Sequence, residues 1–236
     1  MPTARLRGVV PSTVAILIPV LARPHRVAPL VESIRAASTV TPCRAVFLAT
    51  EGDDAEIAAI RAVQEQDDTV ALHTTRKDSN SWAKKINYGF TMTHEPFVFM
   101  GADDIHFHPG CIERMLACHL ETGACVVGTN DGGHLGTMTG EHSTHTLVCR
   151  EYGECGTIDE PDSGMVLHPA YAHWFPDQEL FATAKYRGTY AHATDAIVEH
   201  FHPNWQKARM DNTYRLGQSF IAQDRALYES RRPLWS

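Results

Sequence analysis

The sequence predicts an α/β fold in which helices flank a mostly parallel sheet. Short, apolar and often β-branched runs alternate with helical patterns through the first 130 residues, a spacing that indicates βαβ units. Each of these runs also ends in small or polar residues. Ligands of such sheets bind beyond the carboxyl ends of the strands, so we expect a site there. The strand-end segments are Pro19–Arg23, Thr50–Asp54, Gly101–Asp104 and Thr129–Asp131.

The composition fits one globular domain spanning residues 1–236, with 43% apolar and 21% charged residues. The net charge of −7, with no long Lys/Arg run, disfavours DNA binding without excluding it. The apolar run Val14–Val20 is bracketed by Pro11 and Pro19 and is too short to span a membrane. We interpret it as a buried first strand rather than a secretory signal. Six cysteines without a framework spacing indicate a reduced, cytoplasmic setting for a soluble protein.

The expected elements follow in chain order through the first half. A helix over Arg26–Ala37 is predicted from its apolar positions at three- and four-residue spacing, and one over Asp53–Gln66 from the acidic residues at its start. Pro109 is expected to open a helix, since proline is favoured in the first turn. The helix that opens at Pro109 is expected to end at Leu120, and a further helix is predicted over Ser81–Met92. The predicted strands are Val14–Val20, Ala45–Ala49, Val70–His73, Phe97–Met100 and Cys125–Gly128.

The second half is less regular and contains no internal repeat. Gly132–His142 is rich in Gly, His and Thr and is expected to be a long binding or lid loop. The further expectations are a strand at Thr144–Cys149, turns at Gly156–Gly164, a helix at Asp177–Arg187, a strand at Ala196–His202 and a helical tail over Asn204–Glu229.

Asp103 and Asp104 follow a strand directly, so their side chains point to different sides. A divalent ion that bridges two phosphates is usually held by one or two carboxylates together with phosphate oxygens. Asp is equally a common turn residue, and from this segment alone the metal and turn interpretations are balanced.

His200 and His202 would lie on one face of a strand, about 6–7 Å apart. Imidazole together with carboxylate and phosphate oxygens favours Mn²⁺ over Mg²⁺. A single histidine is ordinary in a chain that has fourteen, but the pair makes a metal site as plausible as a structural role.

Asp177 and Glu179 fall in the first turn of a helix that follows aromatic residues. They suit capping and the helix dipole, but a carboxylate against an apolar wall can also serve as a general base. Lys84 and Asn87 lie one helical turn apart and could reach a nucleotide, although a solvated lysine pair is the more ordinary interpretation.

Taken in order, these segments resemble the family-2 glycosyltransferases of the GT-A fold, over Val14 to His202. The resemblance departs from the family pattern at Gly101, where the Asp-x-Asp motif has its first Asp. One carboxylate is therefore missing, which weakens metal binding unless a histidine compensates. The segments that carry the resemblance are Ile16–Pro24 (strand and nucleotide loop), Leu48–Asp54 (base contact), Asn80–Gly89 (donor-facing helix), Phe99–Asp104 (metal motif) and Trp174–Leu180 (catalytic base).

The resemblance implies a single-domain GT-A-like fold with a mostly parallel, Rossmann-like sheet. Residues 10–130 would bind the nucleotide sugar, and residues 131–236, with the helical tail, would bind the acceptor and hold the catalytic groups. Asp177 would be the general base, with Glu179 next in line. The metal, Mn²⁺ or Mg²⁺, would be held by Asp103, Asp104 and His200, with His202 as the alternative ligand. The donor contacts would come from Pro19, Leu21, Arg23, Glu51, Lys84, Asn87, Ala102 and Asp103.

The implied activity is transfer of a sugar, from a UDP-sugar by preference, to an acceptor hydroxyl, with inversion. The acceptor, a small molecule, a protein or a hydroxymethylated base of phage DNA, stays open. A sugar nucleotidyltransferase ranks lower because Val20–Pro24 has no glycine, whereas Gly101 favours a non-catalytic nucleotide-sugar-binding module. If neither Asp177 nor Glu179 is the base, Asp131 or Asp162 comes next, and a retaining mechanism then becomes the better interpretation.

Overall fold

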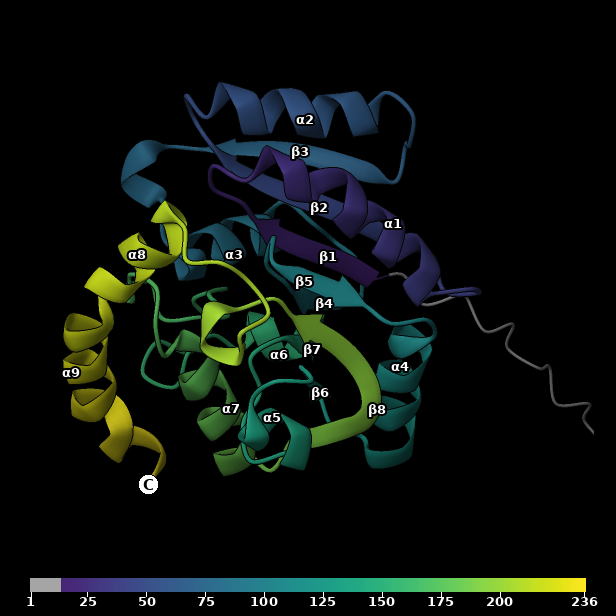
Figure 1. Cartoon of the computed structure of the whole chain (residues 1–236). Helices are drawn as coiled ribbons and strands as arrows, with labels where there is room; N and C mark the ends of the chain where they lie inside the picture. Colours follow the sequence, from purple (N-terminus) through teal and green to yellow (C-terminus); the bar gives the residue numbers. More distant parts are fainter. Residues whose placement is uncertain (1–13) are drawn as a thin grey trace, which may run out of the picture.

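The computed structural model describes residues 14–236. Pro11 and the first residues of the predicted nucleotide-binding half, 10–13, therefore lie outside the described residues. Eight strands of the described chain form one sheet in the order β3-β2-β1-β4-β7-β6-β8-β5 (Figure 1). The strands are β1 (Val14–Pro19), β2 (Cys43–Thr50), β3 (Val70–Thr75), β4 (Phe97–Met100), β5 (Ile105–Phe107), β6 (Val126–Asn130), β7 (Thr146–Cys149) and β8 (Tyr190–His200).

The parallel part of the sheet is built as predicted, and the other part is mixed. β1 pairs in parallel with β2 and β4, and β2 pairs in parallel with β3. β7 runs antiparallel between β4 and β6, and β8 pairs in parallel with β6 and antiparallel with β5. The long, curved β8 thus connects the edge strand β5 to the middle of the sheet (Figure 1).

Helices cover both faces of the sheet, because alternate residues of its strands point to opposite sides. Ile16 of β1 packs with α1, α2 and α4, whereas its neighbour Leu17 packs with α3, α6 and α7. All of β1 is buried, as expected for a central parallel strand. The helices are α1 (Val27–Ala37), α2 (Asp54–Gln64), α3 (Trp82–Thr91), α4 (Cys111–Thr122), α5 (Leu135–Thr139), α6 (Arg150–Glu154), α7 (Pro176–Tyr186), α8 (Asn212–Ser219) and α9 (Ile221–Arg231).

Several short elements differ from the sequence expectations. β5 and α6 were not predicted, and α5 forms inside the expected 132–142 loop, because three- to five-residue elements carry too little periodicity to recognise. The predicted C-terminal helix is broken into α8 and α9 at Phe220, after an irregular segment in which Gln206 has a φ of 59°. Gly110, in the left-handed region, precedes α4, so Pro109 lies just outside that helix. No helix within residues 14–236 is long and apolar enough to cross a membrane.

Candidate active site

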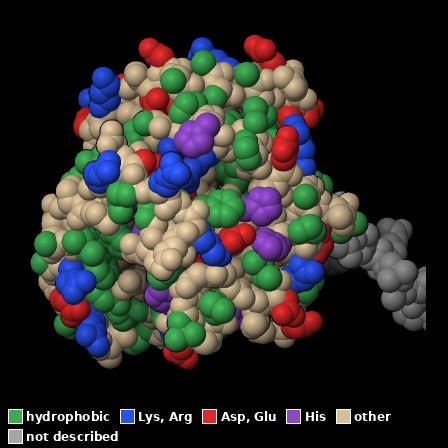
Figure 2. Space-filling model, in the orientation of Figure 1, with side chains coloured by type: hydrophobic (Ala, Val, Ile, Leu, Met, Phe, Trp, Pro, Cys, Tyr) green, Lys and Arg blue, Asp and Glu red, His purple; other side chains and the backbone are tan. Residues whose placement is uncertain are grey.

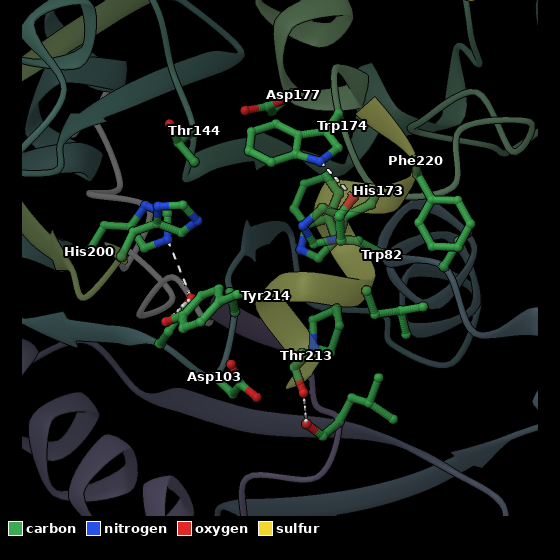
Figure 3. Close-up of a pocket in the computed structure, with 18 of the residues that line it drawn as sticks. Trp82, Asp103, Thr144, His173, Trp174, Asp177, His200, Thr213, Tyr214 and Phe220 are labelled. Carbon is green, nitrogen blue, oxygen red and sulfur yellow. Dashed lines mark hydrogen bonds and ion pairs between the residues drawn. The ribbon is translucent and has the colours of Figure 1, made fainter. Parts of the chain in front are cut away.

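A cavity of about 370 Å³ opens at the carboxyl ends of β1 and β4 (Figure 3). Its floor is the loop after β1 and the Ala102–Asp104 segment after β4, and its walls come from the 134–145 loop, the start of α7, the end of β8 and α8. The cavity therefore lies where the parallel sheet predicted a site. Of the predicted site residues, it brings together Pro19, Leu21, Arg23, Ala102, Asp103, Asp104, Asp177, His200 and His202.

Arg23 is a buried cation that lines this cavity. Its guanidinium lies 2.7 Å from Asp103 Oδ1 and 3.6 Å from Asp104 Oδ2, and it donates to both Asp211 oxygens at 2.9 and 3.1 Å. It also lies over the Tyr214 ring, 3.9 Å from the ring centre. The backbone N–H of Arg23 donates to Glu56 Oε2 at 2.6 Å, which fixes the loop that carries the guanidinium. The two strand-end carboxylates thus have a built-in countercharge.

The two neighbouring carboxylates differ in pKa. Burial, together with the charge of Asp104, raises the pKa of Asp103 to about 6 against the effect of Arg23. Burial acts in the same direction on Asp104, but the charges of His200 and Arg23 outweigh it and hold the pKa of Asp104 well below its usual range. Two coupled carboxylates at one site commonly separate in this way. Asp104 therefore stays ionised to a lower pH than Asp103 does.

His200 reaches the same carboxylate from the end of β8. Its Nε2 lies 3.5 Å from Asp104 Oδ2, and its buried Nδ1 has no hydrogen-bond partner in the described chain. The ring of His145, whose nitrogens also lack partners there, lies 5.0 Å from that of His200. His202 lies 5.2 Å from His200, ring to ring, but its Nδ1 accepts the backbone N–H of Asn204 at 3.2 Å. His200 is thus directed at Asp104, and His202 caps the turn that follows.

These groups fit a divalent ion that a substrate helps to hold. Within residues 14–236, no cluster of three or more His, Cys, Asp or Glu side chains is arranged to bind a metal. A site that bridges a diphosphate needs only one or two protein ligands, and the Asp104–His200 pair supplies one carboxylate and one imidazole. The structure thus aims His200 at Asp104 rather than at Asp103, which pairs with Arg23.

Asp177 lies on the opposite wall, near Trp174 (Figure 3). Its Oδ2 is 3.4 Å from Nε2 of His142 in the 134–145 loop. Burial opposes ionisation of Asp177, but His142 outweighs it and lowers the pKa of the carboxyl. The indole of Trp174 donates to the Gly217 carbonyl oxygen at 2.8 Å, so the aromatic wall beside Asp177 is fixed in orientation.

Four predicted site residues do not line this cavity. Glu51 and Lys84 are exposed, and the Lys84 ammonium lies 3.4 Å from the Asp78 carbonyl oxygen. The Asn87 side chain bonds both the N–H and the carbonyl oxygen of Leu167, at 3.0 and 2.7 Å, which ties α3 to a distant loop. Glu179 is buried against Arg231 and the Tyr171 hydroxyl at 2.7 Å, away from the cavity.

Other lining residues escaped the sequence analysis. Lys85, rather than Lys84, faces the cavity, and its ammonium donates to the Val20 carbonyl oxygen at 2.7 Å. Trp82 donates to the Gly101 carbonyl oxygen at 3.0 Å. Tyr214 of α8 lies 3.0 Å from Asp104 Oδ2. The helical period places Lys85 and Trp82 on one face, a signal that could have found Lys85, but no sequence pattern predicts the docking of α8.

Asp131 and Asp162, the fallback bases, lie in loops. Asp131 Oδ1 accepts the N–H groups of Gly133 and His134 and the hydroxyl of Thr137, so it organises the loop that includes α5. Asp162 is exposed, with a φ of 59°, in the 156–164 turns. Neither residue lines the cavity.

Little space surrounds Gly101, the position at which the sequence departs from the Asp-x-Asp pattern. A Cβ at this position would lie 3.1 Å from the Leu17 carbonyl oxygen and 3.3 Å from Ile105 Cδ1. These contacts are tighter than ordinary van der Waals distances, and the backbone carbonyl cannot move away easily because Gly101 N–H bonds to it at 2.9 Å. A side chain at 101 would therefore require these neighbours to shift by a few tenths of an ångström.

No model of a known protein family matches the chain, and no curated protein sequence matches it. Solved structures do match. S. aureus TarS in complex with UDP is 12% identical over 79% of this chain and 59% of that one, with a TM-score of 0.61. A mannosyltransferase from Pyrobaculum calidifontis in complex with GDP-Man and Mn²⁺ is 14% identical over 90% and 64%, with a TM-score of 0.63.

Glucosyl-3-phosphoglycerate synthase from Mycobacterium tuberculosis, in complex with Mn²⁺, UDP and glucosyl-3-phosphoglycerate, is 14% identical over 93% of this chain and 80% of that one, with a TM-score of 0.61. The chain spans less than two thirds of the length of the TarS and mannosyltransferase structures. At these identities the likeness establishes the fold, and it confirms the GT-A-like fold that the sequence predicted.

Proposed function

We propose that this GT-A-like chain is a glycosyltransferase that moves a sugar from a nucleotide-diphosphate sugar to an acceptor hydroxyl. One observation carries the proposal: a single cavity brings an ionised strand-end carboxylate, a histidine directed at it and a second carboxylate on the facing wall together. Transfer needs a place for the leaving diphosphate and a base for the acceptor, and these two walls provide one each.

The donor belongs on the Arg23 side of the cavity. The backbone of Pro19 and Leu21, the turn at Ala102 and the buried ammonium of Lys85 surround this side. Arg23 and Lys85 are buried cations, which would stabilise the charge that develops on a departing diphosphate. UDP is the favoured nucleotide, because two of the three solved structures described above contain UDP and the third contains GDP-Man.

Asp104 and His200 would hold a divalent ion together with diphosphate oxygens, and His202 is the alternative ligand. Mn²⁺ suits this set better than Mg²⁺, since imidazole is a poor ligand for Mg²⁺. Two of the solved structures contain Mn²⁺. When bound, the ion would neutralise charge on the diphosphate.

Asp177 is proposed to accept the proton of the acceptor hydroxyl. The acceptor oxygen attacks the anomeric carbon while the bond from that carbon to the diphosphate oxygen breaks, and the electron pair leaves with the diphosphate. The hydroxyl proton passes to a carboxylate oxygen of Asp177. Attack from the side opposite the leaving group inverts the configuration of the sugar. The fixed indole of Trp174 would hold the acceptor next to the carboxylate.

The test is a panel of UDP-, GDP- and TDP-sugars, measured by thermal shift with and without Mn²⁺, followed by detection of released nucleotide. A ligand at one hundred times its Kd should stabilise the fold by about 2.7 kcal/mol through mass action. Mn²⁺-dependent stabilisation by one donor, with turnover, supports the proposal. Stabilisation without turnover across an acceptor panel would favour a non-catalytic nucleotide-sugar-binding module, and no stabilisation by any donor would reject donor binding.

The acceptor is proposed only as a hydroxyl compound. On the face shown in Figure 2, acidic and basic side chains are interspersed and histidines lie among them. The net charge of −7 also gives no general attraction for a phosphate backbone. A small-molecule or protein hydroxyl is therefore favoured over modified DNA as the acceptor. An acceptor panel that includes hydroxymethylated DNA would distinguish between these classes.

A further inference from the structure

The start of α7 is built to hold Asp177 in one place. Phe175, immediately before the helix, has a φ of 74°, in the left-handed region that residues other than glycine seldom adopt. Its ring stacks on Tyr228 of α9, with 5.3 Å between ring centres. Pro176 then occupies the first turn of the helix, where its fixed φ fits. A strained, anchored backbone at a cavity wall is a feature of functional positions.

The carboxylate of Asp177 meets a single cationic partner in the described chain, His142. Their side chains are 21% and 13% exposed, so water screens the pair only in part. The 3.4 Å separation is longer than a good hydrogen bond, so the carboxylate keeps room to turn toward an acceptor.

His142 is itself fixed from three sides. Its backbone N–H donates to the Gly136 carbonyl oxygen at 3.1 Å. Its ring meets His134 edge to face, with 5.1 Å between centres, and Phe181 of α7 at 6.1 Å. A Cβ at Gly136 would lie 2.8 Å from His134 and 3.0 Å from the His142 Cβ, so only glycine lets this loop pack so closely. The loop thus presents His142 to Asp177.

From this geometry we propose that His142 is a positioning residue for the base, holding the Asp177 carboxylate ionised and directed into the cavity. The proposal rests on the proposed function, in which Asp177 takes the acceptor proton. His142 does not touch the reacting atoms. It acts through Asp177, by charge and by contact.

The surrounding charges agree with this role. Burial acts to lower the pKa of His142, but Asp177 outweighs it, with a smaller contribution from Asp131, and the net pKa is raised. His145 makes a smaller contribution to the lowered pKa of Asp177. Glu141, the exposed neighbour of His142 in the chain, pairs with Lys185 at 3.9 Å. His134 has a lowered pKa, first through burial and then through His142. His142 is therefore the histidine of this wall whose protonated form Asp177 stabilises.

Loss of His142 should raise the pKa of Asp177. Without His142, the burial of Asp177 is no longer opposed by a nearby cation, so Asp177 should gain a proton at a higher pH than in the native chain. Loss of an opposite charge at this distance moves a carboxyl pKa by about 1–3 units. At saturating donor and Mn²⁺, so that protonation of His200 does not limit the rate, the acid limb of the pH–rate profile for kcat should move upward by that amount, while the rate at high pH is largely kept.

The experiment compares His142→Gln with the control His73→Gln, which removes a half-buried imidazole of β3 outside the cavity. In His142→Gln the acid limb should rise by at least about one pH unit, and in His73→Gln it should stay in place. An unmoved limb in His142→Gln overturns the proposal. A rate loss of about 10²-fold or more at all pH values, equal to that of Asp177→Asn, also overturns it, because His142 would then be the base itself.

A second readout does not depend on sugar transfer. NMR titration of the histidine rings, with the His142 signal identified by its absence in His142→Gln, should show the pKa of His142 falling in Asp177→Asn. If the His142 titration is the same in both backgrounds, the ion pair is absent and the proposal fails, whatever the activity. If the pair is present but no donor is turned over, the proposed function fails, and with it the catalytic role of the pair.

Discussion

Replacing Arg23 with methionine should cost far more stability than its single charge suggests. The substitution keeps the buried stem and removes the guanidinium that neutralises Asp103 and Asp104. Both carboxylates are more than nine-tenths buried and cannot be rescued by water. Removing one partner of a buried ion pair costs about 3–5 kcal/mol, because the other charge stays buried and uncompensated. The contact with Asp211, which is 38% exposed, adds little.

The assay is urea unfolding and thermal melting in the presence of a chelator, so that no added metal substitutes for the lost cation. For a chain of this size, each kcal/mol lowers Tm by about 2–4 °C, so Arg23→Met should melt at least about 6 °C lower than the native protein. Arg35→Met is the matched control. Arg35 pairs with Asp67 at the surface and is half exposed, so its loss should cost about 0–1 kcal/mol.

The pH dependence provides a second check on Arg23. The pKa of Asp103 is raised to about 6 in the folded chain, so the folded state binds a proton that the unfolded chain releases near pH 4. Stability therefore falls as pH rises through this window, and loss of Arg23 extends the window to higher pH. The deficit of Arg23→Met should shrink as pH is lowered from about 7.5 to 5. A deficit no larger than that of Arg35→Met, and independent of pH, would refute the reasoning.

The remaining predictions concern the two walls of the cavity and the buried acid behind it. Asp177→Asn should bind donor normally yet transfer sugar about 10²–10⁴-fold more slowly; near-normal transfer would leave Asp177 as a structural acid of α7. His200→Ala should weaken Mn²⁺-dependent donor binding in calorimetry more than His202→Ala does. Mn²⁺ binding by the native chain should also weaken at acidic pH, when His200 becomes protonated. Burial acts to lower the pKa of His200, but the charge of Asp104 outweighs it, and the net pKa is raised. If both variants bind Mn²⁺ as the native chain does, the ligand assignment is wrong. Glu179→Gln should destabilise the fold, since it breaks the pair with Arg231, but folded molecules should still bind donor; loss of donor binding by a fully folded variant would contradict its structural role.

The position of Asp103 and Asp104 beside the other strand ends could be predicted, because strand ends of a parallel sheet meet at one edge. Asp177, in the first turn of α7, was assigned to the site by the resemblance to family-2 glycosyltransferases. The two acids could be placed at the strand end from the apolar pattern of β4 and the residue at which that pattern stops. His200 was harder to place, since its strand begins at Tyr190, six residues before the predicted start. The run Tyr190–Asp195 contains too many polar residues to resemble a strand, yet it pairs along β6.

What the sequence could not show are contacts between segments far apart in the chain. Arg23 and Asp211 meet only because α8 docks over the loop after β1. His142 lies in a loop whose shape depends on Asp131 and on the absence of a side chain at Gly136. Tertiary packing decides both contacts. Lys85, by contrast, could have been chosen over Lys84 from the helical period, which places it on the same face as Trp82.

The position of β8 has a consequence for how the molecule folds. Strands β1 to β4 can pair through short βαβ connections, so this half of the sheet can form early. β8 must instead find β6 and β5 across long stretches of chain, and such distant contacts form slowly because closing the loop costs entropy first. Since His200 ends β8, the cavity should be completed late in folding. A newly made chain would therefore have the floor of the cavity before it has the walls.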